Sequence, residues 1–356
     1  MICRPRRILA LFLLAVMPTL CAPPKKKIII TGATADVVKE LQEAAPDAEI
    51  VSLLPARSQT FTRLQGGVPR TPQDREEMSR QVADADAFIG MPNQEILKAA
   101  KKLRWVQASG AGVETLRFPE LIDSDIVLTN LQKIASPGIA DHAMGMLLAL
   151  TRQLVYHISA RTQAGARAPV DALELQGMTG VIIGVGGVGS SVAVRAWASG
   201  MKLIGVDPRD ISPTPFIQRA VYPDRLDSVL PEADVVFVCA PDTPESRNMM
   251  GQRQFDLMKK GSYFIAVSRG TLYNMDALVS VLASGKLAGA GVDVTNPEPL
   301  PRDHPLRKFE NVIITPHMAT RSQNEGRRQI ELLKENISRF LKGEPLKYVV
   351  DKHKGY

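Results

Sequence analysis

Three charged side chains of complementary chemistry occur in the second half of the chain, each after an apolar run. Arg269 lies in "VSRGT", Glu298 in "GVDVTNPEPLP" and His317 in "TPHMAT". An imidazole titrates near neutral pH and can give or take a proton, and a carboxylate on its other nitrogen fixes the tautomer. A guanidinium can hold a carboxylate and polarise a neighbouring carbonyl. A lone histidine after a strand is more often structural, so this interpretation requires the three side chains to converge.

The elements around these residues explain how they could converge. Short apolar runs alternate with helix-length segments, and the runs are continuous instead of alternating between apolar and polar residues. This pattern is typical of a parallel sheet covered by helices on both faces. Each of the three motifs would then fall at the carboxyl end of a strand, which is the edge where ligands bind in such sheets.

The most specific local signal is a glycine-rich turn between a strand and a helix. The pattern Gly184-x-Gly186-x-x-Gly189 joins a predicted strand over 181–185 to a predicted helix over 188–199. The first glycine permits a tight turn, the second lets the backbone approach a pyrophosphate, and the third lets helix and strand pack closely. Phosphates would lie on the amide groups of the helix N-terminus, so the motif predicts dinucleotide binding.

An acidic residue at the end of the next strand completes this pattern. Asp207 follows the glycines at the expected distance of about 20 residues. Its carboxylate would accept hydrogen bonds from the adenosine ribose hydroxyls, which favours NAD, whereas Arg209 could accommodate the 2′-phosphate of NADP. The alternative is that Asp207 is a solvated turn residue in "DPRD". We therefore expect NAD as the coenzyme, with NADP as the alternative.

The alternation of elements predicts an α/β protein with two doubly wound parallel-sheet domains. Residues 27–130 together with 318–350 would form a flavodoxin-like substrate domain, and residues 131–317 an inserted Rossmann domain that binds NAD. A surface loop is expected over 55–74, which is rich in proline, glycine and polar residues. Helices are expected over 35–45, 137–163 and 321–342, and strands of the first series over 27–31, 49–54, 86–90, 103–109 and 126–130.

Taken together, these motifs resemble the D-isomer-specific 2-hydroxyacid dehydrogenases, a family that includes glyoxylate/hydroxypyruvate reductases and phosphoglycerate dehydrogenases. The resemblance runs from about residue 27 to residue 350. "VQASGAGVETL" is similar to the family's substrate loop, "IADHAMGMLLALTRQL" to its interdomain helix and "GVGGVG" to its coenzyme loop. The stretch "SRGTLYNMDALVSVLASGKLAGAGVDVTNPEPLPRDHPL" and the later "NVIITPH" resemble its catalytic region almost position by position.

The resemblance implies roles for individual residues. Arg269, Glu298 and His317 would be the catalytic arginine, glutamate and acid/base histidine. The backbone of the substrate loop would bind the substrate carboxylate together with Arg269, through Ser109, Gly110, Ala111 and Gly112. Coenzyme contacts are expected at Gly184, Gly186, Gly187, Val188, Gly189, Asp207, Val267, Ser268, Arg269, Asp293 and His317.

Three positions depart from the family pattern. Glu114 stands where many members carry aspartate, Asp141 replaces a usual glutamate in the interdomain helix, and Ala266 replaces a usual asparagine before the arginine motif. None of these departures falls on Arg269, Glu298 or His317, so they bear on the identity of the substrate and the details of the loops.

The charge balance argues against a nucleic-acid surface. The chain has 356 residues and a formal net charge of +7, but six of its 44 Lys and Arg residues lie within residues 1–27, which contain no acid. The remaining 38 basic residues face 37 acidic ones, so no basic surface for nucleic acid is expected. Of the three cysteines, only Cys239 lies beyond the N-terminal region, and we expect neither a disulfide framework nor a metal site.

The N-terminal residues have the layout of a secretory signal. "MICRPRR" is a charged region, "ILALFLLAVMPTL" is an apolar core and "CAPP" ends it, and this core is too short to span a membrane comfortably. We expect residues 1–26 to be a signal peptide or an N-terminal extension, and the protein to be exported. One alternative is a cytoplasmic enzyme with a misassigned start codon or an apolar N-terminal extension, and another is an N-terminal anchor that is not cleaved.

These observations predict an NAD-dependent oxidoreductase that interconverts a small 2-keto acid and a D-2-hydroxy acid, with His317 as the acid/base. The alternative is an NADH-sensing binding protein, because the same fold with the same three residues also resembles transcriptional corepressors. The predicted helix over 137–163 carries more apolar surface than one neighbouring domain would cover, which usually marks an interface. The family resemblance also suggests a twofold dimer, so we expect a homodimer through this helix.

The other candidate side chains are expected to have structural roles. His142 and His157 lie on the long helix and would be packing or interface residues. Trp105 and Trp197 are expected in the core, and Tyr273 would either line the cleft or pack beneath it.

Overall fold

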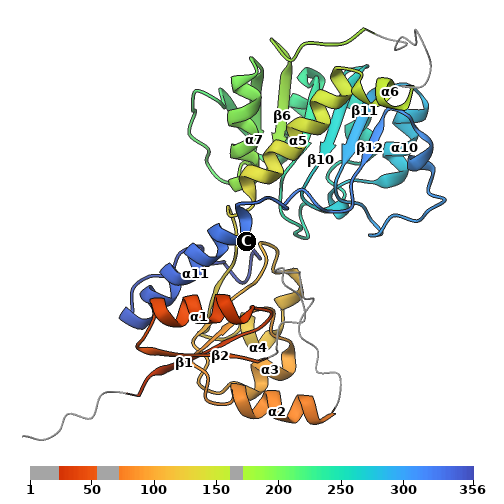
Figure 1. The fold of residues 1–356 in the computed structure, drawn as a ribbon. Coiled ribbons are helices and arrows are strands. Elements are labelled where there is room, and N and C mark those ends of the chain that lie inside the picture. The colour runs from red at the N-terminus through yellow and green to blue at the C-terminus, as the bar shows by residue number, and fades with distance from the viewer. Residues whose placement is uncertain (1–23, 54–71, 161–170) are drawn as a thin grey trace, which may run out of the picture.

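The structure is a computed structural model that describes residues 24–53, 72–160 and 171–356. Most of the expected signal region, most of the expected surface loop and the last residues of the expected long helix lie outside these ranges. Figure 1 shows two α/β bodies, one above the other, with the C-terminus at the junction between them.

Within the described residues, the lower body contains a five-stranded sheet with the order β2-β1-β3-β4-β5, and every pair in it is parallel. Its centre is apolar because Ile28, Ile29 and Ile30 of β1 are fully buried between the two layers of helices. The strands are β1 (Lys26–Ile30), β2 (Ala48–Ser52), β3 (Ala87–Ile89), β4 (Trp105–Gln107) and β5 (Val127–Thr129).

Helices cover both faces of this sheet. Leu333, Ile337 and Phe340 of α11 join the core on one face together with α1, and α2, α3 and α4 cover the other. The chain therefore returns to the first sheet after it has built the second (Figure 1). These helices are α1 (Ala35–Ala44), α2 (Pro72–Val82), α3 (Gln94–Ala99), α4 (Pro119–Ile122) and α11 (Glu325–Lys342).

In the described part of the chain, the upper body holds a seven-stranded parallel sheet with the order β12-β11-β10-β9-β6-β7-β8. The strand order reverses at β6, which pairs with β7 on one side and β9 on the other. Such a reversal opens a crevice at the carboxyl edge of a doubly wound sheet. The strands are β6 (Thr179–Ile183), β7 (Lys202–Val206), β8 (Arg219–Val221), β9 (Val235–Val238), β10 (Ser262–Ala266), β11 (Leu287–Val292) and β12 (Val312–Ile314).

Helices α5 and α7 pack on one face of the second sheet, and α8, α9 and α10 on the other. The α-helices are α5 (Ser136–Thr151), α6 (Leu154–Ser159), α7 (Gly187–Ala198), α8 (Leu226–Val229), α9 (Gln252–Leu257) and α10 (Met275–Ala283). Short 3₁₀ turns are η1 (Glu114–Leu116), η2 (Pro223–Arg225), η3 (Leu230–Glu232), η4 (Gly270–Leu272) and η5 (Pro305–Lys308). None of the helices in the described ranges is long and apolar enough to cross a membrane.

The predicted fold class is confirmed, and four local predictions are corrected. The expected surface loop over 55–74 extends too far, because α2 already begins at Pro72. The expected helix over 137–163 is not continuous: α5 ends at Thr151, Gln153 adopts a left-handed φ of 58°, and α6 begins again at Leu154. The expected helix over 321–342 begins only at Glu325. Trp197 was expected in the core but is 46% exposed, because it lies on the outer side of α7.

Candidate active site

His317 and Glu298 meet at the carboxyl edge of the seven-stranded sheet. Glu298 lies in the loop after β11 and His317 in the loop after β12, and the Nδ1 atom of His317 is 2.6 Å from Oε1 of Glu298. A carboxylate can only accept a hydrogen bond, so Nδ1 carries the proton. The other ring nitrogen, Nε2, is then left to exchange a proton with a ligand.

The backbone of His317 is held in a conformation that non-glycine residues rarely adopt. Its φ is 50°, and its N–H donates to the carbonyl oxygen of Asp293 at 2.8 Å. The Asp293 carboxylate is 1% exposed and accepts hydrogen bonds from Thr315 Oγ1 (2.6 Å), Met318 N (2.8 Å) and Ala319 N (3.0 Å). Asp293 therefore fixes the loop that presents His317, and its expected contact with the coenzyme stays a prediction.

Helix α5 supports the same loop through His142. The Nε2 atom of His142 lies 2.9 Å from Thr315 Oγ1 and 3.7 Å from Asp293 Oδ1. From the sequence, His142 was expected to be a packing or interface residue. The helical spacing around it gives no sign that it would meet a loop 173 residues further along the chain.

Arg269 lies in the loop after β10 and faces the first body. Its Nε donates to Glu114 Oε1 at 3.1 Å and its Nη1 to the carbonyl oxygen of Ser268 at 2.8 Å. A Cβ on Gly112 would lie 2.0 Å from Nη2 of Arg269, so the guanidinium rests directly on the glycine of the expected substrate loop. The structure thus brings together Arg269 and the loop after β4, with Glu114 as a partner that sequence reasoning did not place in the site.

A second glycine brings Arg269 toward the loop that carries Glu298. A Cβ on Gly270 would lie 2.1 Å from the carbonyl carbon of Thr295 and 2.2 Å from its oxygen. These atoms belong to the backbone and cannot give way. Gly270 therefore allows the loops after β10 and β11 to touch, which places Arg269 and Glu298 at neighbouring points of one edge.

The expected substrate loop, Ser109–Gly112, follows β4 in the first body. The carbonyl oxygen of Gly110 accepts from Leu131 N at 3.0 Å, and that of Ala111 accepts from Asn130 Nδ2 at 2.6 Å. The C=O and N–H of a trans peptide point in opposite directions. The N–H groups of Ala111 and Gly112 therefore point away from the segment around Asn130 and remain as candidate donors to a carboxylate.

The glycines of the expected coenzyme loop have the geometry that close phosphate approach requires. Gly184 has a φ of +90°, and a Cβ there would lie 2.5 Å from the Ala240 backbone. A Cβ on Gly189 would lie 1.9 Å from the carbonyl oxygen of Gly184, whereas a Cβ on Gly186 would meet no atom within 4 Å. The first and third glycines thus serve packing, and the second leaves open space beside the N-terminus of α7. These residues fit a dinucleotide.

The remaining predicted coenzyme contacts lie along the same carboxyl edge. Val188 is in the first turn of α7, and Val267 and Ser268 follow β10, two strands away from β6. The hydroxyl of Ser268 is buried and has no hydrogen-bond partner within the protein. The order of strands places the catalytic candidates at one end of the edge and Asp207 at the other.

Asp207 is already engaged within the protein. Asp207 is 4% exposed, and its carboxylate accepts hydrogen bonds from Val185 N at 2.8 Å and from Arg209 N at 3.0 Å. The Arg209 guanidinium adds a bidentate contact, with Nε 2.8 Å from Oδ1 and Nη2 2.9 Å from Oδ2. Burial raises the pKa of Asp207, but the hydrogen bonds from Arg209 and Val185 outweigh this and lower its pKa overall. A ribose hydroxyl can reach this carboxylate only if Arg209 moves aside.

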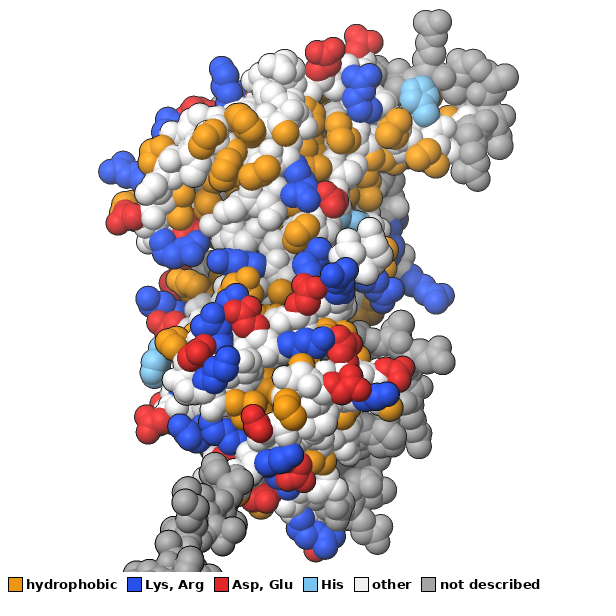
Figure 2. All heavy atoms as spheres, turned by 60° about the vertical axis from the view of Figure 1, so that its left-hand side comes forward, with side chains coloured by type: hydrophobic (Ala, Val, Ile, Leu, Met, Phe, Trp, Pro, Cys, Tyr) orange, Lys and Arg blue, Asp and Glu red, His pale blue; other side chains and the backbone are white. Residues whose placement is uncertain are grey.

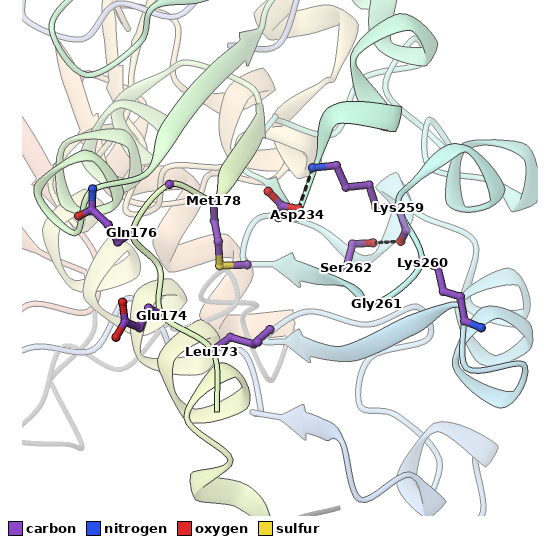
Figure 3. Close-up of a pocket in the computed structure, with 10 residues that line it drawn as sticks. Leu173, Glu174, Gln176, Met178, Asp234, Lys259, Lys260, Gly261 and Ser262 are labelled. Atoms are coloured by element: carbon purple, nitrogen blue, oxygen red, sulfur yellow. Dashed lines mark hydrogen bonds and ion pairs between the residues drawn. The ribbon is translucent and has the colours of Figure 1, made fainter. Parts of the chain in front are cut away.

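A pocket at the opposite edge of the same sheet is separate from these groups. It has a volume of about 320 Å³ and is lined by residues at or before the start of β6, β9 and β10 (Figure 3). The Asp234 carboxylate in it already accepts from Thr179 N at 2.7 Å and Lys259 Nζ at 2.8 Å. Because the strands are parallel, this pocket lies at their amino ends and far from the loops of Arg269 and His317.

Comparison with known proteins agrees with the motifs. The model of the D-isomer specific 2-hydroxyacid dehydrogenase NAD-binding domain matches residues 144–319. A glyoxylate reductase from Thermofilum pendens is 30% identical over 291 residues, which are 79% of this chain and 86% of that protein. A glyoxylate reductase from Korarchaeum cryptofilum is 32% identical over 283 residues, which are 77% of this chain and 85% of that protein.

Solved structures show the same architecture. A D-lactate dehydrogenase from Aquifex aeolicus, in complex with NAD and lactic acid, has a TM-score of 0.70 and 25% sequence identity to this chain. The match covers 89% of this chain and 96% of that one, so it includes both bodies. With the sequence relatives and the matching domain model, this shows that the chain belongs to the D-isomer specific 2-hydroxyacid dehydrogenase family of NAD(P)-dependent enzymes.

Proposed function

We propose that this protein reduces a small 2-keto acid to a D-2-hydroxy acid with NAD(P)H, and that His317 supplies the proton. The observation that carries the proposal is the 2.6 Å contact between His317 Nδ1 and Glu298, at the edge where Arg269 also lies. When bound, the coenzyme supplies the hydride. The reaction then needs a proton donor and a group that stabilises negative charge on the carbonyl oxygen.

His317 donates the proton, and Glu298 orients its ring. The carboxylate of Glu298 orients the ring and stabilises the positive charge that the ring carries before it gives up a proton. The Nε2–H group then faces the developing alkoxide. Asp293 and the left-handed backbone at His317 keep the ring at this position while the substrate enters and leaves.

The carboxylate and carbonyl of the substrate would be bound by groups from both bodies. Arg269 has its Nε and Nη1 engaged with Glu114 and Ser268, so its Nη2 edge, beside Gly112, is the edge left for the substrate. The N–H groups of the substrate loop can take a second carboxylate oxygen. This combination favours acids with a carbonyl or a hydroxyl on the carbon next to the carboxylate. Glyoxylate, named for the reductase relatives, is such a 2-oxo acid, and lactic acid, named for the dehydrogenase structure, is such a 2-hydroxy acid.

A substrate panel tests the proposed function. Glyoxylate, hydroxypyruvate, pyruvate and bulkier 2-keto acids are each supplied with NADH and with NADPH, and coenzyme oxidation is followed by absorbance. We expect turnover with at least one small keto acid and formation of the D-hydroxy acid. Tight NADH binding without turnover for any member of the panel would favour an NADH-sensing protein instead.

We also propose that the protein acts as a homodimer through the region of α5, α6 and α7. Exposed apolar side chains occur there at Leu148, Leu154, Ile158, Val194 and Trp197, and α5 and α7 pack side by side. Figure 2 shows hydrophobic side chains gathered on the visible face of the upper body. Large apolar surfaces of this kind usually mark protein interfaces.

For the location of the protein, we propose export followed by cleavage near Cys21–Ala22. This proposal rests on the sequence of residues 1–26, most of which lie outside the described residues. Fractionation of the native host, followed by N-terminal sequencing of the purified protein, tests it. A cytoplasmic product that retains residues 1–22 would overturn the export proposal and leave the catalytic one intact.

A further inference from the structure

The coenzyme loop lacks a cation of its own at the point where a diphosphate would bind. Helix α7 begins at Gly187, its N-cap Gly186 makes no side-chain capping bond, and its first turn contains no charged side chain. The first N–H groups of a helix have no partner within the helix, and the helix dipole adds partial positive charge there. These groups attract phosphate, but a diphosphate also carries full negative charges that partial charges balance incompletely.

A lysine from another segment covers this helix end. A Cβ on Gly187 would lie 2.8 Å from Cγ of Lys133, 3.2 Å from its Cα and 2.8 Å from Oγ of Ser136. The absence of a side chain at Gly187 is therefore what lets Lys133 approach the first turn of α7. Ser136 is 4% exposed, and its hydroxyl has no hydrogen-bond partner, so an unsatisfied polar group also lies against this turn.

The charge of Lys133 is available to a ligand. The side chain is exposed, and its ammonium lies 5.5 Å from the ring centroid of Tyr348, a cation–π contact that is weak at an exposed site. Among the residues that the structure describes, no Asp or Glu forms an ion pair with Lys133. Its flexible four-carbon stem can carry the ammonium from the Tyr348 ring toward the N-terminus of α7.

The segment that carries Lys133 connects the two bodies and touches both functional loops. Lys133 has a left-handed φ of 69°, in a turn directly before α5. Just upstream, Asn130 and Leu131 hydrogen-bond to the carbonyl oxygens of Ala111 and Gly110 in the substrate loop. A ligand that binds Lys133 would therefore bind to the segment that joins the two bodies and is hydrogen-bonded to the substrate loop.

We propose that Lys133 binds the diphosphate of the dinucleotide and supplies the cation that the glycine-rich turn lacks. The inference rests on the proposed function, because it assumes that the site takes a dinucleotide. The N–H groups at the start of α7 hold one side of the diphosphate, and the Lys133 ammonium approaches from the connecting segment. The ligand class is a pyrophosphate diester, so ADP-ribose and NADH share the contact.

The test measures binding without turnover, by isothermal titration calorimetry with NADH and with ADP-ribose. Lys133→Gln removes the charge and keeps a polar side chain, and Lys133→Arg keeps the charge. Lys133→Gly removes the side chain but suits the left-handed φ, so it separates the charge from the backbone conformation. Lys202→Gln is the matched control, because Lys202 is an exposed lysine at the amino end of β7, the edge away from the coenzyme loop.

We expect Lys133→Gln and Lys133→Gly to raise the Kd of both ligands by about tenfold, the size of one hydrogen bond to a charged group. The effect should shrink at high salt, and Lys133→Arg and Lys202→Gln should bind as the wild type does. Wild-type affinity in Lys133→Gln or Lys133→Gly would overturn the inference, as would equal losses in Lys133→Arg and Lys133→Gln. A wild-type protein that binds neither NADH nor ADP-ribose would instead refute the proposed function.

Discussion

Replacing Glu298 with glutamine tests how much the negative charge of Glu298 contributes to proton donation by His317. The glutamine keeps the size of the side chain and an acceptor oxygen within reach of His317 Nδ1, which lies 2.6 Å from Glu298 Oε1 in the wild type. What it removes is the negative charge that stabilises a protonated ring. We therefore expect kcat/KM for the keto acid to fall while the affinity for NADH is unchanged.

The size of the fall follows from the kind of hydrogen bond that is lost. A hydrogen bond to a charged group contributes about 1.5–3 kcal/mol, and one between neutral groups about 0.5–1.5 kcal/mol. Because Glu298 is 40% exposed, solvent screens its charge and the difference belongs at the low end, about 1 kcal/mol. This corresponds to a decrease in kcat/KM of roughly five- to tenfold.

A double-mutant cycle makes the prediction specific to His317. His317→Ala alone removes the proton donor and should lower kcat/KM by at least about 10²-fold. If Glu298 acts through the histidine, adding Glu298→Gln to His317→Ala should change kcat/KM very little. The assay is steady-state turnover of the four enzymes at saturating NADH, with the NADH Kd measured separately by fluorescence.

Two results would refute this reasoning. The first is a Glu298→Gln enzyme with kcat/KM within twofold of the wild type, which would mean that the carboxylate does not assist the ring. The second is full additivity in the cycle, because the same loss in the His317→Ala background would show that Glu298 acts on the substrate or the fold by another route.

Three further changes test other parts of the site. Gly112→Ala places a Cβ 2.0 Å from Arg269 Nη2, so the guanidinium must move. KM for the keto acid should then rise more than about fivefold while the NADH Kd is unchanged. An unaltered KM would contradict the contact between Arg269 and the substrate. Arg209→Ala frees the Asp207 carboxylate for a ribose hydroxyl and removes a cation that could bind a 2′-phosphate. The kcat/KM with NADH divided by the kcat/KM with NADPH should therefore rise about tenfold. An unchanged ratio would mean that Asp207 and Arg209 do not select the coenzyme. Trp197→Glu places a charge on the exposed face of α7, so light scattering at micromolar concentration should show dissociation of the dimer to monomers. A dimer that remains stable would mean that the interface lies on another surface.

The parallel two-sheet fold was predictable because its strands are continuous apolar runs, as in β1 and β9, where the local pattern and the tertiary environment agree. The break in the long helix was not predictable. Arg152 and Gln153 carry no proline or glycine signal, and the interruption exists only as the left-handed φ of Gln153. The exposure of Trp197 was missed for a related reason, since burial of a large side chain depends on which face of α7 meets the sheet.

The main site residues were predictable from their order along the chain. Parallel strands place their carboxyl ends along one edge, so Arg269, Glu298 and His317, which follow the adjacent strands β10, β11 and β12, had to lie near one another. Contacts between distant segments could not be derived in this way. Arg269 meets Glu114 across 155 residues of sequence, and this contact depends on how the two bodies pack and on side-chain rotamers.

In the coenzyme pocket, even a contact between residues close in sequence could not be predicted. The sequence placed Asp207 and Arg209 two residues apart and left open which of them would face the ribose. The structure shows that they bind each other through two hydrogen bonds between the side chains. Such a pair depends on the turn after β7 and on rotamers that no spacing rule supplies.

The most direct test of the central claim is a comparison of wild-type and His317→Ala protein with NADH and a small 2-keto acid, with NADH binding measured on the same samples. We expect the wild type to oxidise one NADH for each D-2-hydroxy acid formed. We also expect His317→Ala to keep most of its affinity for NADH but to lose at least about 10²-fold in turnover. Turnover by His317→Ala at the wild-type rate would contradict the role of His317 as the proton donor.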